Sequence, residues 1–232
     1  MERWQQCCRL AAIIAYRRIR PASMNDYSAT SAGLTEHDAA TIAINQRMNK
    51  FDGHAQVWLF GYGSLIYKAD FPFIERRPAS ITGWTRRFWQ GSHDHRGTPA
   101  APGRVATLVP QAGAVCDGMA YLITPEVFAH LDHREKNGYL RLAIDISFED
   151  GSHAEGLVYI ASEENAAFLG AASEADIARQ IALAAGPSGP NSEYLLHLAR
   201  ALRELGKHDA HVFAIEQHLL QSREACRSGT MA

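Results

Sequence analysis

The residues most able to do chemistry lie in one short segment, FGYGSL, at residues 60–65. Its two glycines flank an aromatic residue and follow the apolar run Val57–Phe60, which is typical of a buried strand. Glycine lets the backbone turn so that several N–H groups face the same way, and such a nest binds an anion. Spacing alone is equally compatible with a plain turn at the end of a strand.

Three familiar motifs do not fit this segment. A dinucleotide fingerprint needs a third glycine where Ile66 stands, and a P-loop needs Gly-Lys-Ser or Gly-Lys-Thr. The nucleophile elbow of the α/β-hydrolases needs a glycine two positions after Ser64, where the chain again has Ile66. An anion-binding nest and a simple turn are the interpretations that remain.

A second candidate is Glu135, which stands between Arg134 and Lys136. A glutamate held in a pocket, with its pKa raised by burial, can take up and return a proton near neutral pH. The flanking cations would oppose that rise in pKa if they lay close to the carboxylate. Taken alone, a glutamate between two cations is more often a solvated surface residue.

A metal site is the third chemistry to consider. His93, Asp94 and His95 follow one another, and two more histidines come at positions 130 and 133. Imidazole and carboxylate groups are ligands that zinc and other transition metals accept. Eleven histidines in the chain make such neighbours common by chance. We therefore expect hydrogen bonding in a loop and no metal.

The composition is that of a folded protein without a strong overall field. The chain has 232 residues, 47% of them hydrophobic, and its 23 Lys+Arg and 25 Asp+Glu give a formal charge of −2. These values exclude a disordered or low-complexity polypeptide and fit a single domain. A neutral chain favours neither nucleic acid nor an anionic membrane as a partner. The basic and aromatic run at 86–90 is therefore expected to be a strand.

Six strands followed by helices are expected to position these residues. Each strand is rich in β-forming residues and is bounded by Gly, Pro or Asp. This order predicts an α+β fold in which the strands close into a small mixed β-barrel with flanking helices, because closure removes exposed sheet edges. The expected strands cover residues 57–60, 80–90, 104–109, 114–123, 139–148 and 155–161.

Four helices are expected. Thr124 is predicted to cap the first, with Pro125 at its first position and its end near Asn137-Gly138. Ser173 is predicted to cap the second, which Gly186 would stop. Leucines at 195, 198, 202 and 205 give the third an amphipathic stripe, and the last is marked by apolar residues at 212, 215 and 219.

The ends of the chain are expected to lie outside the main domain. We predict a partly flexible extension over residues 1–55, the domain over 56–222 and a tail over 223–232. The apolar run Leu10–Tyr16 is far shorter than the ~18 residues of a membrane span. An amphipathic tail, or a true start at Met24, explains it better.

The cysteines favour a reducing compartment. Four cysteines in a chain of this length make no disulfide scaffold, and the adjacent Cys7 and Cys8 are poorly placed to pair with one another. A cytoplasmic location is the expectation that follows.

Several blocks, taken in order, resemble the ChaC-type glutathione-specific γ-glutamylcyclotransferases. The resemblance covers roughly Val57 to Leu219, and the family's small mixed β-barrel agrees with the strands-then-helices order. One departure is Asn137, which stands where the family has glycine. The matching blocks are FGYGSLI at 60–66 with DFP at 70–72, RRFWQGS at 86–92 with DHRG at 94–97, REK at 134–136 and AGPSG at 185–189.

The resemblance implies a reaction and a site. Glutathione would be cleaved to 5-oxoproline and cysteinylglycine, because the α-amine of its γ-glutamyl group attacks the γ-carbonyl of the same group. Glu135 would be the catalytic acid/base, and no cofactor, metal or protein nucleophile would be needed. The residues that would bind the γ-glutamyl group are Leu59, Phe60, Gly61, Tyr62, Gly63 and Ser64.

Alternatives remain open at this point. The same barrel could act on other γ-glutamyl amino acids or γ-glutamylamines, or could bind a γ-glutamyl compound without catalysis. A metal hydrolase built on residues 93–95 is the poorest of the alternatives. Arg96 and Tyr139 are candidates for contact with the Cys-Gly half of glutathione, and the sequence leaves the oligomeric state unassigned.

Overall fold

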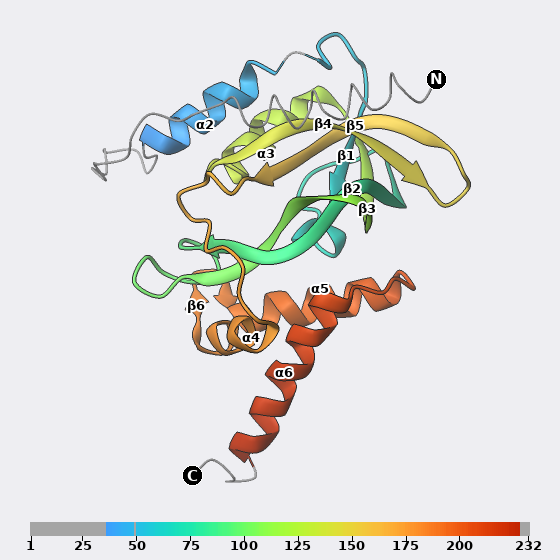
Figure 1. Ribbon diagram of the computed structural model, residues 1–232. Helices are drawn as coiled ribbons and strands as arrows, with labels where there is room; N and C mark the ends of the chain where they lie inside the picture. Colours follow the sequence, from blue (N-terminus) through green and yellow to red (C-terminus); the bar gives the residue numbers. More distant parts are fainter. Residues whose placement is uncertain (1–35, 49, 228–232) are drawn as a thin grey trace. The chain divides into compact units, whose positions relative to one another are not determined.

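The computed structural model describes residues 36–48 and 50–227 (Figure 1). The interpretations given above for Leu10–Tyr16, Met24, Cys7 and Cys8 therefore concern residues outside the described part of the chain.

A closed five-stranded barrel is the centre of the fold, as the prediction of an α+β barrel requires (Figure 1). Neighbouring strands pair antiparallel, except that the first and last strands close the barrel in parallel. Around the barrel the order is β1 (Val57–Gly61), β3 (Gly103–Ile123), β2 (Glu75–Ser92), β4 (Tyr139–Phe148) and β5 (His153–Ala161).

The prediction of six barrel strands was wrong by one. The expected strands at 104–109 and 114–123 are one strand, β3, of 21 residues. Pairing with β2 continues on both sides of the expected turn, with Val109 opposite Thr85 and Val115 opposite Thr82. Pro110 and Gly113, read as a turn, instead mark an irregularity inside a long paired ribbon.

Two cores share the first strand. Alternate side chains of a strand point to opposite faces, so Phe60 and Leu59 of β1 enter different clusters. The larger cluster joins the barrel to α4, α5 and α6, whereas the smaller includes Leu131 of α3 and Tyr121 of β3. The end of β1 is thereby held rigidly between two packed layers.

The helix after β3 is shorter than predicted. Residues Pro125–Val127 form the 3₁₀ turn η2 and Phe128–Arg134 form α3. The predicted cap at Thr124 was wrong in one respect, because its side chain makes no capping hydrogen bond. The helix ends before Asn137 because Glu135 already leaves the helical conformation and Gly138, at φ +81°, turns the chain into β4.

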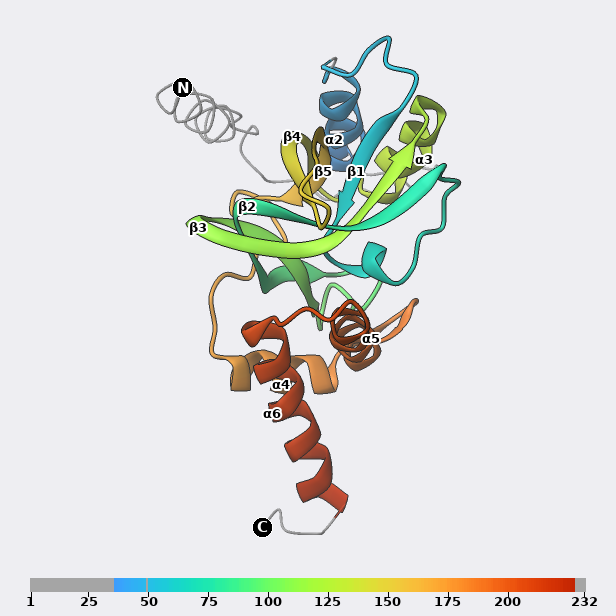
Figure 2. The same cartoon turned by 90° about the vertical axis from the view of Figure 1, so that its right-hand side faces the viewer.

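The three C-terminal helices occupy the opposite side of the barrel from α3 (Figures 1 and 2). They are α4 (Glu174–Leu183), α5 (Asn191–Glu204) and α6 (Ala210–Arg227). Ser173 caps α4 as predicted, since its hydroxyl accepts the N–H of Asp176 at 3.1 Å. The predicted stop at Gly186 was wrong, because the helix ends at Leu183 and Gly186 belongs to the hairpin of β6 (Ala185–Gly186) and β7 (Gly189–Pro190).

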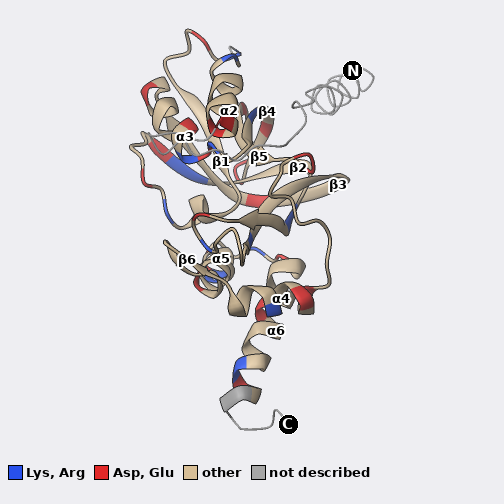
Figure 3. Cartoon of the chain, turned by 90° about the vertical axis from the view of Figure 1, so that its left-hand side faces the viewer, with Lys and Arg blue, Asp and Glu red and all other residues tan. Residues whose placement is uncertain are grey.

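An additional helix, α2 (Glu36–Gln46), precedes the barrel and packs against α3 and β4. It belongs to the same compact unit as the barrel. Figure 3 shows basic and acidic residues mixed over the described elements. Among residues 36–48 and 50–227, no helix combines the length and the apolar character that a membrane crossing needs.

Candidate active site

The glycine turn after β1 is built by close contacts. A Cβ added to Gly61 would lie 2.5 Å from the Cβ of Leu65, and one added to Gly63 would lie 2.8 Å from the hydroxyl of Tyr194. The 3₁₀ turn η1 (Ser64–Ile66) follows at once. The space available therefore requires glycine at position 61, where the neighbour is a Cβ fixed to the backbone, whereas at position 63 a side chain would have to displace the end of the Tyr194 side chain.

Leu59 and Phe60 do not present their side chains to this turn. Both are fully buried in the two cores, and their backbones pair with β3 on one side and β5 on the other. Of the predicted substrate-binding residues, those placed in or next to the turn itself are Gly61, Tyr62, Gly63 and Ser64.

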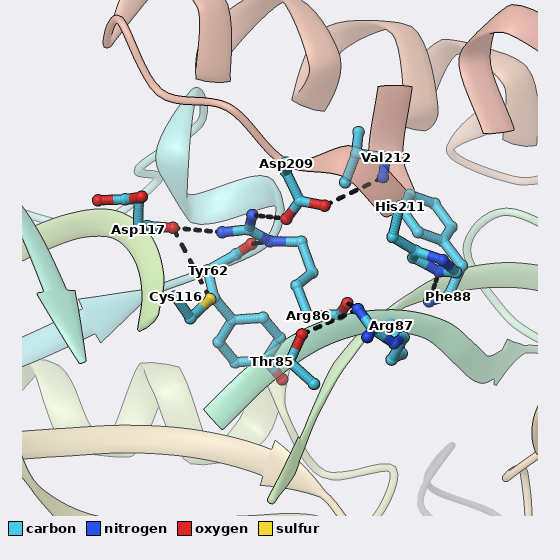
Figure 4. Close-up of polar contacts among 10 residues, drawn as sticks. All are labelled: Tyr62, Thr85, Arg86, Arg87, Phe88, Cys116, Asp117, Asp209, His211 and Val212. Atoms are coloured by element: carbon cyan, nitrogen blue, oxygen red, sulfur yellow. Dashed lines mark hydrogen bonds and ion pairs between the residues drawn. The ribbon is translucent and has the colours of Figure 1, made fainter. Parts of the chain in front are cut away.

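A buried arginine on β2 fixes the backbone of the turn (Figure 4). The Arg86 side chain, 1% exposed, donates from Nε to the carbonyl oxygen of Tyr62 at 2.6 Å. Its Nη1 pairs with Asp209, just before α6, at 2.6 Å, and its Nη2 donates to the carbonyl oxygen of Asp117 beside Cys116. Three separate segments are thus held by one guanidinium.

Glu135 comes to the same turn from α3. It lies at the C-terminal cap of the helix, and its N–H donates to the Leu131 carbonyl at 2.8 Å. Its carboxylate lies 3.2 Å from Nε of Arg134, and Nη2 of that arginine donates to the Ser64 hydroxyl at 3.1 Å. Nη1 of Arg134 binds Asp70. One arginine therefore joins Glu135 to the glycine turn.

Burial is the largest influence on the pKa of Glu135. Its side chain keeps 17% of its surface exposed but is densely surrounded by protein atoms, and this burial raises its pKa above the ordinary value. The cation of Arg134 lowers the pKa, whereas the nearby carboxylates of Asp70 and Asp94 raise it. The opposition expected from a flanking cation is present, and burial outweighs it.

Three buried phenols interact electrostatically with this carboxylate. Burial raises the pKa of Tyr62, Tyr139 and Tyr194, and the charge of Glu135 contributes to the rise in each; the pKa of Tyr194 is raised to about 12. Each phenol therefore stays protonated near neutral pH and can donate a hydrogen bond. The hydroxyl of Tyr194 also accepts the N–H of Ala106 at 3.2 Å.

The His93–His95 segment takes part in hydrogen bonds at the edge of the site. Asp94 accepts the side-chain amide of Asn137 at 2.5 Å, and Nδ1 of His95 lies 3.3 Å from the Ser188 hydroxyl. Within the described ranges, no three His, Cys, Asp or Glu side chains are grouped as a metal would require. The hydrogen-bonding interpretation of this loop is the one that these contacts match.

Arg96 and Tyr139, the two candidates for the Cys-Gly half, differ in their surroundings. Arg96 donates from Nη1 to the carbonyl of Pro190 at 3.1 Å and lies 3.4 Å from Glu193. Tyr139 is one of the three phenols that interact electrostatically with Glu135.

A cavity of about 150 Å³ is lined by other residues. They include Met48, Phe128 and Arg141, and none of the predicted site residues is among them.

Sequence reasoning missed Arg86 and Tyr194. A signal for the first exists, since Arg86, Phe88 and Gln90 alternate along β2 and all three are buried. A cation at an inward position of a strand needs acceptors, and the turn supplies one. Tyr194 gives no such signal, because it lies next to the leucine stripe of α5 and resembles a core residue.

Known proteins share this architecture. The family described as ChaC-like protein matches residues 57–222. Gamma-glutamylcyclotransferase 2-3 of Arabidopsis thaliana is 45% identical over 183 residues, which cover 72% of this chain and 92% of the relative. Glutathione-specific gamma-glutamylcyclotransferase 1 of Danio rerio is 41% identical over 179 residues, which cover 72% and 91%.

A solved structure agrees with the sequence relatives. The crystal structure of a γ-glutamyl cyclotransferase specific to glutathione from yeast matches with a TM-score of 0.68 at 32% identity, over 72% of this chain and 97% of that one. The barrel described above is thus a γ-glutamylcyclotransferase fold. The chain belongs to the ChaC-like family.

Proposed function

We propose that this chain is a glutathione-specific γ-glutamylcyclotransferase that cleaves glutathione to 5-oxoproline and cysteinylglycine. The observation that carries the proposal is the link from Glu135 through Arg134 to Ser64, which brings a carboxylate of raised pKa to the glycine turn. The names of the relatives support the same reaction.

Glu135 is proposed to move the proton. The α-amine of the γ-glutamyl group is an ammonium near neutral pH, and the carboxylate takes one proton from it. The free amine then attacks the γ-carbonyl carbon, a new C–N bond closes the five-membered lactam, and the bond to the cysteine nitrogen breaks. Glu135 returns this proton to the departing nitrogen. The attacking nitrogen then gives up a second proton as it becomes the lactam N–H, and the amine of cysteinylglycine takes it up and leaves as an ammonium, so that atoms and charge balance without water or a cofactor.

The glycine turn is proposed to hold the γ-glutamyl arm in its curled form. Attack within one molecule is a problem of alignment, for which good positioning is worth on the order of 7–11 kcal/mol. Gly61 to Ser64 would supply this grip through the backbone, whereas Leu59 and Phe60 would act by fixing the strand that carries the turn.

The test is product formation by the wild-type chain and by Glu135→Gln. We expect 5-oxoproline and cysteinylglycine from wild type, and a loss of roughly 10²–10⁴-fold in kcat for the isosteric variant. Glu126→Gln, at an exposed glutamate of η2, is the matched control and should keep full activity. A folded Glu135→Gln variant with most of its rate would contradict the assigned role.

Substrate choice separates this proposal from its closest alternative. Glutathione and γ-glutamyl-alanine carry the same γ-glutamyl arm, so a preference for glutathione measures recognition of the Cys-Gly half. Equal kcat/KM values would favour a broader cyclotransferase. Tight glutathione binding with no product over hours would favour a non-catalytic barrel. We further propose a cytoplasmic location and a catalytic domain spanning residues 56–222.

A further inference from the structure

Helix α2 buries polar side chains, and one of them, Asn45, binds the barrel. Asp38, Thr41 and Asn45 recur at helical spacing and are its buried residues, with Asn45 only 1% exposed. A surface helix normally buries an apolar face, because a buried polar group costs free energy unless it is hydrogen-bonded. A polar buried face therefore indicates that α2 is held by specific hydrogen bonds. The helix also lies before residue 57, outside the family match.

Asn45 binds the backbone of β4 at two places. Its Nδ2 donates to the carbonyl oxygen of Tyr139 at 2.9 Å, and its Oδ1 accepts the N–H of Arg141 at 2.8 Å. Residues two apart on a strand direct these groups toward the same edge. The side-chain amide thus makes the pair of hydrogen bonds that a neighbouring strand would otherwise make.

That edge of β4 needs such a partner. The strand pairs with β2 only over Ile146–Phe148, although its pairing with β5 runs from Tyr139 to Ser147. The first half of β4 consequently leaves the β2 side of the barrel, and Asn45 satisfies two of the backbone groups exposed there. In the described part of the chain, α2 is the element seen to bind these two groups.

The residues of β4 that Asn45 binds come directly after the turn at residues 135–138, which contains Glu135. The N–H of Tyr139 donates to the carbonyl oxygen of Glu135 at 3.2 Å, so the residue whose carbonyl Asn45 binds is itself hydrogen-bonded to the backbone of Glu135. Arg141 also pairs with Asp132 of α3, with Nε to Oδ1 at 2.8 Å. At the other end of α2, a Cβ added to Gly138 would lie 3.2 Å from Nε2 of His37.

We propose that Asn45 is a positioning residue that fixes the start of β4 and, through Tyr139, the direction in which Glu135 faces the glycine turn. This inference rests on the proposed role of Glu135. Part of the catalytic geometry is thereby supplied by a segment outside the residues that match the family. The glycine turn, which is proposed to bind substrate, is held by a separate contact with Arg86.

The experiment compares Asn45→Ala and Asn45→Asp with wild type in the full-length chain. The alanine removes both hydrogen bonds, whereas the aspartate keeps an acceptor for Arg141 and places a carboxylate oxygen against the Tyr139 carbonyl. We expect kcat to fall roughly 10- to 100-fold, the cost typical of a misplaced catalytic group, and KM to change less than about threefold. Ala40→Gly weakens the helix at an exposed position without removing a contact, and should keep kcat.

Two readouts separate positioning from a merely structural role. Hydrogen exchange at the Arg141 amide should increase in Asn45→Ala, because that N–H loses its acceptor. The acidic limb of the kcat profile should move to lower pH. Loosening the turn between Glu135 and Tyr139 admits water to Glu135, which lowers its pKa because burial is the main cause of the raised value, while Arg134, Asp70 and Asp94 stay in place. A general loss of stability would instead raise exchange at protected amides throughout the described part of the chain and would leave the acidic limb in place.

These experiments distinguish failure of the Asn45 inference from failure of the role proposed for Glu135. Unchanged kcat and an unchanged pH profile in Asn45→Ala, with Glu135→Gln inactive, would overturn the role of Asn45 alone. An equal fall in kcat for Ala40→Gly would also overturn it, because any weakening of α2 would then lower kcat, whether or not the Asn45 hydrogen bonds are kept. Full activity of Glu135→Gln would overturn the role of Glu135 and the Asn45 inference together.

Discussion

Glu135 carries its proton to a higher pH than an ordinary glutamate, although a guanidinium lies 3.2 Å away. Burial is the larger influence, and Arg134 limits the rise. This balance suits a group that must accept a proton from an ammonium and return it within one catalytic cycle. The arginine is therefore expected to tune the site as well as to connect Glu135 with Ser64.

Arg134→Gln should move the acidic limb of the rate profile to higher pH. Removing the cation that lowers the pKa of Glu135 leaves the carboxylate protonated up to a higher pH, so the base form appears later. We expect kcat to fall about tenfold or more near neutral pH, measured as 5-oxoproline release from pH 5 to 9. Arg134→Lys keeps the charge and should leave the limb nearly in place. A limb that moves to lower pH in Arg134→Gln would contradict this account.

Glu135 should also reduce the stability of the fold. Its folded pKa lies above the ordinary value of 4.5, so the free energy of unfolding falls as pH rises from 4.5 through the folded pKa. Glutamine does not ionise, so the Glu135→Gln variant does not lose this part of the free energy of unfolding as pH rises. The difference in unfolding free energy, variant minus wild type, should therefore increase from pH 4 to pH 8, by about 1.4 kcal/mol for each unit by which the pKa is raised. Urea denaturation at the two pH values measures it, and a decrease would be inconsistent with a raised pKa.

At the scale of elements, the end of β1 depends on close packing. Gly61 leaves room for Leu65, and a Cβ added to Gly118 of β3 would lie 2.3 Å from the Gly61 carbonyl oxygen. The turn is thus pressed against its neighbours from both directions. A methyl group there would displace backbone instead of the end of a flexible side chain.

Gly61→Ala is therefore expected to cost about 1–3 kcal/mol of unfolding free energy and most of the activity. Gly151→Ala is the matched control, because Gly151 has φ +82° with open space around it in the hairpin between β4 and β5. That variant should lose stability through backbone strain while keeping kcat per folded molecule. Thermal unfolding and product assays on both variants decide the matter. Full activity in Gly61→Ala would show that the turn tolerates a side chain.

Sequence patterns predicted the elements well where local signals agree with tertiary contacts. β4, the Ser173 cap and the leucine face of α5 follow from periodicity and capping chemistry. The pattern failed at Pro110 and Gly113, because turn residues also occur at irregularities within paired strands. The contacts of Arg86 and Asn45 could not be predicted, since each joins residues more than 20 positions apart.

For the molecule as a whole, Arg86 connects the helical layer to the site (Figure 4). Asp209 binds Arg86 with Oδ2, and its Oδ1 accepts the N–H of Val212 at 3.1 Å in the first turn of α6. A second connection is His211, whose Nε2 accepts the Phe88 N–H at 3.0 Å. The start of α6 and the glycine turn therefore share one polar cluster.

Asp209→Asn should test this connection. The substitution keeps an oxygen but removes the charge beside a buried guanidinium, so we expect a loss of about 3 kcal/mol or more in unfolding free energy and reduced turnover. Glu204→Gln breaks an exposed ion pair with Arg200 and should change stability by no more than about 0.5 kcal/mol. If both variants lowered the free energy of unfolding equally in urea denaturation, the buried Arg86–Asp209 pair would contribute no more to stability than an exposed ion pair.

The burial of Cys116 beside Arg86 has a consequence for the reactivity of its thiol with disulfides. It is 3% exposed, and burial raises its pKa to about 11. At pH 7 only about one molecule in ten thousand would carry the reactive thiolate there. Disulfide exchange requires that form and access to it. We therefore expect Cys116 to form mixed disulfides with oxidised glutathione only slowly, so that oxidation at this thiol seldom disturbs the cluster that supports the glycine turn.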